Sequence, residues 1–140
     1  ALSATRAAVE EGIVPGGGLA LLRAREALDG VSLEGDEQTG VNILREALVK
    51  PLMLISENTG VSGEVILAET LKGEAGFGYD AESGEYGDLL EKGIMDPAKV
   101  TRAAIENASS VAAMVLTTES LISDIPKAEP AAPAMPPMDY

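Results

Sequence analysis

The sequence predicts a mainly α-helical fold that carries one small β-hairpin. Through most of the 140 residues, apolar side chains recur at helical spacing and are separated by Gly and Pro. Apolar residues make up 46% of the chain but aromatic residues only 3%, so Ala, Val, Leu and Ile must build a core of closely packed helices. The stretch Gly73–Leu89 departs from this pattern because its Phe and Tyr residues are interleaved with glycines, as in a hairpin.

The first half of the chain is expected to consist of short helices joined by tight turns. A helix over residues 1–11 ends at Gly12, a suitable C-cap. Because the sequence begins inside this helical pattern, without an N-cap or an initiator Met, we expect a fragment of a longer protein. Asp36 suits the start of a later helix, and Ser62 is a good N-cap. The further helices expected are 19–28, 36–50, 52–57 and 62–71.

The second half is expected to begin with the hairpin and to end in a long helix. Phe77 and Tyr79 fall on one strand of the hairpin and Tyr86 on the other. Asp96 can cap the long helix, and Pro97 suits its first position. The remaining expectations are an apolar stripe (Val100, Ala104, Ala108, Val111, Val115), a terminal strand over 120–125 that closes the domain 1–125, and a flexible Ala/Pro/Met-rich tail over 126–140.

Composition and charge exclude several classes of function. The chain has no Cys and no His, which excludes disulfides, thiol catalysis and Ser-His-Asp mechanisms and removes the commonest metal ligands. A formal net charge of −13 at pH 7 argues against nucleic acid and anionic membrane surfaces as partners. No uncharged apolar run is long enough to span a membrane. The composition indicates an acidic helical domain compatible with the cytoplasm.

Three consecutive glycines, Gly16, Gly17 and Gly18, are the first candidate site. Ordering a glycine in regular structure costs roughly 0.5–1 kcal/mol, so a chain keeps such a run where a turn needs unusual dihedrals or where a ligand approaches the backbone. The run matches neither the dinucleotide-binding fingerprint nor the Walker loop, and no strand is expected before it. The pattern favours an inter-helix turn and leaves close ligand approach open.

The acidic candidates also have plain structural interpretations. Asp96 can be a helix N-cap, or its carboxylate can accept hydrogen bonds from the vicinal hydroxyls of a ribose. Residues 79–82 lie at a hairpin tip, where polar side chains usually form a solvated turn. Glu10 and Glu11 point to different sides of a helix and are best explained, like the residues over 34–37, as a solvated face.

Three long segments of the chain carry a family resemblance, namely Ala4–Gly18, Glu85–Gly87 with Gly93–Arg102, and Ser109–Glu119. They resemble the group I chaperonins, the double-ring ATP-driven folding machines of bacteria and organelles, and they occur in the family's order. The resemblance covers nearly all of residues 1–125. It implies the C-terminal part of the chaperonin equatorial domain, a mainly helical domain that binds ATP and makes ring contacts.

The resemblance implies a nucleotide site along the glycine triplet. The triplet would line the ribose and base, with Gly17 in closest contact, and residues 79–82 would form the wall on the base side. Ile94 would pack on the adenine, and Asp96 would bind the ribose hydroxyls. The implied nucleotide-binding residues are Gly16, Gly17, Gly18, Tyr79, Asp80 (where the family commonly has Asn), Ala81, Glu82, Ile94 and Asp96.

The resemblance also implies that the cofactor is ATP with Mg²⁺ and that the phosphate and metal ligands lie outside this sequence. The phosphate loop and the magnesium-binding Asp would belong to a missing N-terminal half, and the family's catalytic Asp would immediately precede Ala1. We therefore expect no catalytic residue, no metal ligand and no ATP turnover in this chain alone. The implied partners are its own N-terminal half, identical subunits in a double ring, a co-chaperonin lid and unfolded client proteins, all in the cytoplasm.

Two other functions stay open on the residues alone. The chain could be a stand-alone helical protein-interaction module without a ligand, in which the glycines are only a turn. A complete small nucleotide-binding enzyme is disfavoured, because the chain offers no recognisable phosphate or metal ligands. The coding sequence upstream of Ala1 would discriminate, since a reading frame that continues into a Thr-rich phosphate loop ending in Asp indicates the chaperonin.

Overall fold

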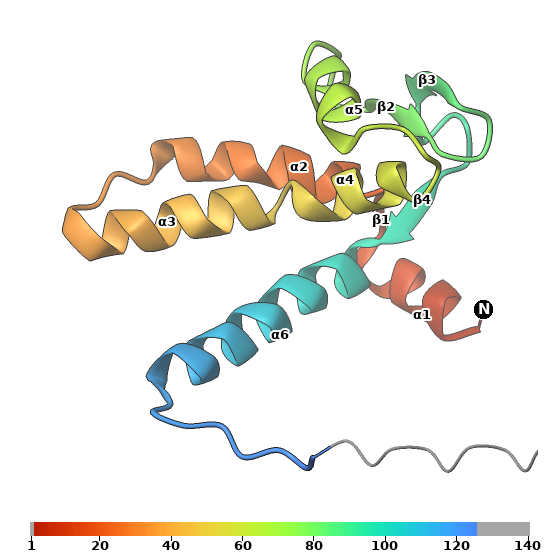
Figure 1. Cartoon of the computed structure of the whole chain (residues 1–140). Coiled ribbons are helices and arrows are strands. Elements are labelled where there is room, and N and C mark those ends of the chain that lie inside the picture. The colour runs from red at the N-terminus through yellow and green to blue at the C-terminus, as the bar shows by residue number, and fades with distance from the viewer. Residues whose placement is uncertain (1, 126–140) are drawn as a thin grey trace, which may run out of the picture.

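The computed structural model describes residues 2–125 and confirms a mainly helical fold with a small β-hairpin, to which it adds a second small antiparallel sheet. The elements in chain order are α1 (Leu2–Glu11), β1 (Ile13–Pro15), α2 (Leu19–Ala24), the 3₁₀-helix η1 (Arg25–Gly30), α3 (Gly35–Ala47), α4 (Lys50–Glu57), α5 (Gly63–Thr70), β2 (Phe77–Asp80), β3 (Glu85–Asp88), β4 (Met95–Pro97) and α6 (Ala98–Thr117). Two helical arms diverge from a junction at β1 and β4 (Figure 1). The predicted tail over 126–140 lies outside the described residues.

The helices begin and end close to where their glycines and caps predict. Gly12 follows the last residue of α1, and its φ of 82° is the left-handed conformation typical of a helix C-cap. Ser62 lies at the N-cap position of α5, as predicted, but its side chain makes no capping hydrogen bond. The single helix expected over 19–28 is instead α2 followed by the tighter helix η1.

The hydrophobic core lies where α2, α4 and α5 meet the turn that follows β3. Six side chains form it, each no more than 3% exposed: Leu19, Leu22, Val49, Leu52, Ile66 and Leu89. Fully burying a side chain of this kind contributes about 1.5–3 kcal/mol. The core therefore fixes the start of α2, directly after the glycine triplet, against the start of α4.

A two-stranded sheet that the sequence did not predict forms the junction of the two arms. β1 pairs antiparallel with β4, so that Val14 lies opposite Asp96 and Pro15 lies opposite Met95. Two expectations are therefore wrong. A strand does precede the glycine triplet, and Asp96 is not the N-cap of α6, because it lies within β4 and Pro97 is the N-cap residue.

The predicted hairpin is confirmed. β2 pairs with β3, and Tyr79 lies opposite Tyr86 with ring centroids 5.4 Å apart, while Phe77 stacks on Tyr86 at 5.8 Å. Because side chains alternate along a strand, these aromatic rings share one face of the hairpin. The other face carries Gly78, where an added Cβ would lie 2.7 Å from Leu89 Cδ1. A glycine at this position lets the hairpin pack directly on the core.

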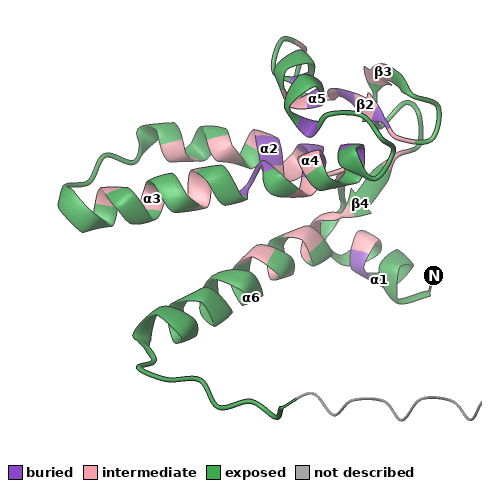
Figure 2. Ribbon diagram, viewed as in Figure 1, coloured by how far each residue is buried: buried purple, intermediate pink, exposed green. Residues whose placement is uncertain are grey.

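The helix α6 is largely exposed (Figure 2), and ion pairs join it to α1. Glu10 pairs with Lys99, and Glu11 pairs with Arg102 at 2.6 Å. The hydrogen bond from Arg102 lowers the pKa of the Glu11 carboxyl. Exposed ion pairs stabilise a fold only weakly, so these contacts orient α1 and α6 rather than anchor them.

The predicted apolar stripe on α6 is present but not buried, since Val100, Val111 and Val115 are each about half exposed. The expectation of a terminal strand over 120–125 is wrong. Strands in the described part of the chain pair only as β1 with β4 and β2 with β3, and Ile122 and Ile125 are 99% and 87% exposed. A strand forms only where a neighbour satisfies its backbone hydrogen bonds, and here no described strand does so.

Candidate functional site

The glycine triplet forms the tight connection between β1 and α2, and its members are glycine for different reasons. The Gly16 N–H donates to Ile94 O at 2.9 Å, and a Cβ on Gly16 would lie 3.1 Å from Ile94 Cγ2. Gly18 has a φ of 79°, and its Cβ would lie 2.6 Å from the main-chain nitrogen of Leu52. Gly17 has a φ of 63°, but its Cβ would have only ordinary contacts, the nearest at 3.6 Å. Close packing therefore explains why positions 16 and 18 are glycines, and no ligand is needed to account for these two.

The ladder of β1 and β4 places Gly16, Ile94 and Asp96 on a common face. Its register sets Val14 opposite Asp96, and the hydrogen bond from Gly16 to Ile94 continues that register by two residues. Since side chains alternate along a strand, Ile94 and Asp96 project to the same side, where the buried Gly16 has no side chain of its own and lies against Ile94. Ile94 packs partly against the core, and Asp96 is exposed. The face thus combines a buried glycine, the apolar side chains of Val14 and Ile94, and an exposed carboxylate.

The hairpin approaches the glycine triplet through its main chain. A Cβ on Gly17 would lie 3.9 Å from the carbonyl oxygen of Tyr79, whereas the Tyr79 ring packs against Tyr86 on the aromatic face. The structure therefore brings the backbone of Tyr79, rather than its ring, to the glycines. Ala81 and Glu82 follow in the hairpin turn, the first half-buried and the second exposed.

The carboxylate of Asp80 is engaged within the hairpin turn. Its Oδ1 accepts the backbone N–H groups of Glu82 at 3.0 Å and Ser83 at 3.3 Å. Its Oδ2 accepts the Ser83 hydroxyl at 2.5 Å and Lys92 Nζ at 3.3 Å. These hydrogen bonds, that of the Ser83 hydroxyl foremost, lower the pKa of Asp80 to about 2. Asp80 therefore holds the turn together, and the sequence analysis did not identify Lys92 as its partner.

Protonation of Asp80 is expected to loosen the hairpin. Because its pKa of about 2 lies below the ordinary value of 3.8, the carboxylate stabilises the fold above about pH 4, and this contribution is lost as the pH falls toward 2. Asp80→Asn lacks the titrating group and should lose less stability over that interval than the unchanged chain. Tyrosine near-ultraviolet circular dichroism of the hairpin would follow the transition, with Glu91→Gln as the control. Identical acid profiles for Asp80→Asn and the unchanged protein would contradict this assignment.

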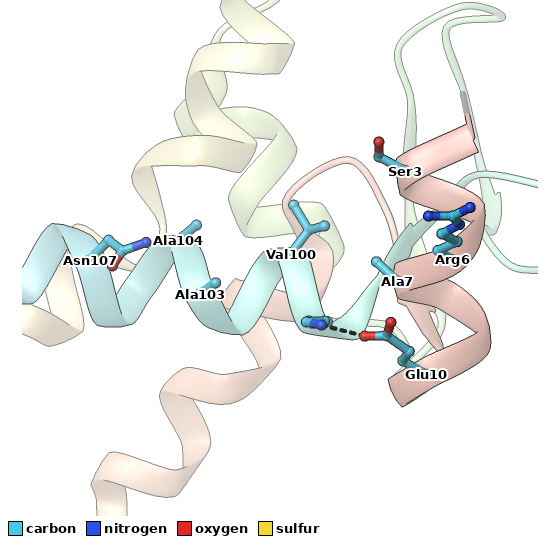
Figure 3. Close-up of a pocket in the computed structure, with 9 residues that line it drawn as sticks. Ser3, Arg6, Ala7, Glu10, Val100, Ala103, Ala104 and Asn107 are labelled. Atoms are coloured by element: carbon cyan, nitrogen blue, oxygen red, sulfur yellow. Dashed lines mark hydrogen bonds and ion pairs between the residues drawn. The ribbon is translucent and has the colours of Figure 1, made fainter.

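A hollow of about 550 Å³ lies away from the glycine triplet, between α1 and α6 (Figure 3). Four of its nine lining side chains are small and apolar, and two of its three charged residues, Glu10 and Lys99, pair with each other. It therefore does not coincide with the face of the β1–β4 ladder. The lining residues are Ser3, Arg6, Ala7, Glu10, Lys99, Val100, Ala103, Ala104 and Asn107.

The groups on the ladder face suit a sugar and a base better than a phosphate or a metal ion. Within residues 2–125, no three or more His, Cys, Asp or Glu side chains are placed to hold a metal ion. A carboxylate such as that of Asp96 accepts hydrogen bonds from hydroxyls but repels phosphate. Separately, none of the helices in this described part of the chain has the length and apolar character needed to cross a membrane.

The two helical arms, the connecting sheet and the hairpin that packs on the glycine turn are the architecture of a chaperonin equatorial-domain fragment. A sequence profile of the TCP-1/cpn60 chaperonin family matches residues 1–126, and the chain belongs to that family. It is similar to the crystal structure of a group III chaperonin in the open state, with a TM-score of 0.74 and 34% sequence identity. That match covers 83% of this chain but only 25% of the other, so the chain spans a quarter of that chaperonin's length.

Proposed function

We propose that this chain supplies the ribose and base side of an ATP site in a chaperonin subunit that assists the folding of non-native proteins. The observation that supports this best is the common face of Gly16, Ile94 and Asp96. Ile94 would pack on the base, and Asp96 would accept hydrogen bonds from the ribose hydroxyls. Gly17 would allow the closest approach to the backbone, and residues 79–82 would form the wall on the base side.

ATP hydrolysis is proposed as a property of the whole subunit. Phosphoryl transfer needs Mg²⁺ and positive charge around the γ-phosphate, and bound ATP would supply the free energy that drives the folding cycle. Among residues 2–125, no group of three or more His, Cys, Asp or Glu side chains is placed to hold a metal ion. We therefore assign the phosphate loop, the magnesium ligands and the catalytic Asp to an N-terminal half. This chain alone would bind ATP weakly and would not turn it over.

The proposed partners are that N-terminal half and identical subunits of a ring. The exposed apolar side chains of α6, among them Val111, Met114 and Leu116, support contacts with further protein. A lid and unfolded clients would bind through other domains, and the subunit would act in the cytoplasm. We propose the group I type from the three segments that resemble that group, whereas the similarity to a group III chaperonin supports the family and not the group.

Asp96→Ala in the complete subunit is expected to weaken ATP binding roughly tenfold to a hundredfold, because hydrogen bonds to a charged acceptor contribute about 1.5–3 kcal/mol. Isothermal titration calorimetry would measure the affinity. The substitution should matter much less for an ATP analogue that lacks the 2′ and 3′ hydroxyls, since the carboxylate would then have no donor to bind. Asp36→Ala, on the exposed start of α3, is the control. Unchanged ATP affinity in Asp96→Ala would remove Asp96 from the site.

A further inference from the structure

Arg23 lies on α2, the helix that begins directly after the glycine triplet, and reaches across to the end of α5. Its Nη2 donates to three main-chain carbonyls, those of Thr70 at 3.1 Å, Gly73 at 3.0 Å and Glu74 at 2.5 Å. The last carbonyls of a helix have no partner within the helix and carry partial negative charge, so a cation is favourable there. Arg23 thereby fastens the loop over residues 70–76 to α2.

From this loop, main-chain hydrogen bonds lead step by step back to the glycine triplet. After the first step, each accepting carbonyl belongs to the residue that donates in the preceding step or to its direct neighbour. In order, the donors and acceptors are Phe77 to Glu74 (3.0 Å), Leu89 to Gly76 (3.0 Å), Ile94 to Leu89 (2.7 Å) and Gly16 to Ile94 (2.9 Å). Because the path starts on α2 and ends just before α2, Arg23 closes a ring of contacts that includes Gly16 and Ile94.

We propose that Arg23 is a positioning residue of the nucleotide site, because it holds the loop over 70–76 on α2 and so fixes Ile94 and the hairpin relative to Gly16–Gly18. This inference rests on the proposed function. Ion pairing does not explain the placement of the guanidinium, since its pair with the exposed Glu26 spans 3.7 Å. Arg23 Nε is buried without a hydrogen-bond partner among the described residues, so the guanidinium is held through the three hydrogen bonds of Nη2.

The test uses Arg23→Met in the complete subunit, which keeps an apolar stem and removes the donors. We expect about tenfold weaker ATP binding and roughly tenfold faster hydrogen exchange at the amides of Phe77, Leu89 and Ile94, with exchange in α3 and α6 unchanged. Arg23→Lys should retain most of the ATP affinity and most of the protection from exchange, since an ammonium group offers three donors to three carbonyls. Arg25→Met is the matched control, because Arg25 makes none of these contacts and should tolerate the change.

The outcomes separate this inference from the proposed function. Unchanged ATP affinity in Arg23→Met overturns the inference even if exchange becomes faster, since Arg23 would then be structural only. If ATP affinity falls equally in Arg23→Lys and Arg23→Met, the inference is overturned as well. If the subunit without any substitution does not bind ATP, the proposed function itself is wrong. If Arg23→Met fails to assemble, Arg23→Gln takes its place: smaller changes at the same amides together with weaker ATP binding support the inference, and unchanged values overturn it.

Discussion

Replacing Gly18 by Ala is expected to destabilise the domain by about 3 kcal/mol or more. The φ of 79° alone costs a residue with a Cβ about 1–2 kcal/mol. The added Cβ would also lie 2.6 Å from the main-chain nitrogen of Leu52 and 2.9 Å from its Cα. These atoms belong to the backbone of α4 and cannot rotate away. The helices α2 and α4 would therefore have to move apart, and the core leucines that they carry would lose contact with one another. The midpoint of denaturant unfolding of the complete subunit measures the loss.

Gly12→Ala is the matched control for this prediction. Gly12 has nearly the same backbone conformation, with a φ of 82°, but an added Cβ would have no heavy atom within 4 Å. Gly12→Ala should therefore lower the free energy of unfolding by only about 1–2 kcal/mol, because of the backbone conformation alone. A similar loss in both variants would show that contact with α4 is not the reason for a glycine at position 18.

The helical part of the fold could be predicted from the sequence because its signals are local. Gly12 follows α1 in the left-handed conformation of a C-cap, and Ser62 lies at the N-cap position of α5, although its side chain makes no capping hydrogen bond. The pairing of β1 with β4 could not be predicted, since it joins three-residue segments that are far apart in the sequence. The segment 120–125 shows the converse. Its β-branched residues favour a strand locally, but no described strand pairs with it.

The family resemblance proposes members of the candidate site, but the sequence does not give their orientations. Asp80 turns its carboxylate into the hairpin turn and toward Lys92, and Tyr79 presents its main chain to the glycines. Such orientations depend on tertiary contacts that no residue spacing encodes. Arg23 likewise lies on an ordinary helix, and only the folded chain brings it to the loop over residues 70–76.

Leu89→Ala is expected to destabilise the domain by about 2–5 kcal/mol and to weaken ATP binding by the complete subunit. Leu89 is 1% exposed, and its Cδ1 would lie 3.6 Å from a Cβ on Gly17 and 2.7 Å from one on Gly78. The side chain therefore fills the space between the glycine turn and the hairpin. Its main chain bonds to Gly76 and Ile94. A cavity at this point would loosen two walls of the proposed site together, so affinity should fall with stability.

Leu90→Ala is the matched control, because it makes the same substitution at the next residue, which is 39% exposed. It should change stability by no more than about 0.5 kcal/mol. Leu89→Met keeps most of the buried volume and should recover most of the loss, which separates packing from a general sensitivity of this turn to substitution. Calorimetric titration with ATP, at a temperature where every variant is folded, then shows whether Leu89→Ala lowers the affinity. Unchanged ATP affinity in folded Leu89→Ala would mean that this contact supports the core without shaping the site.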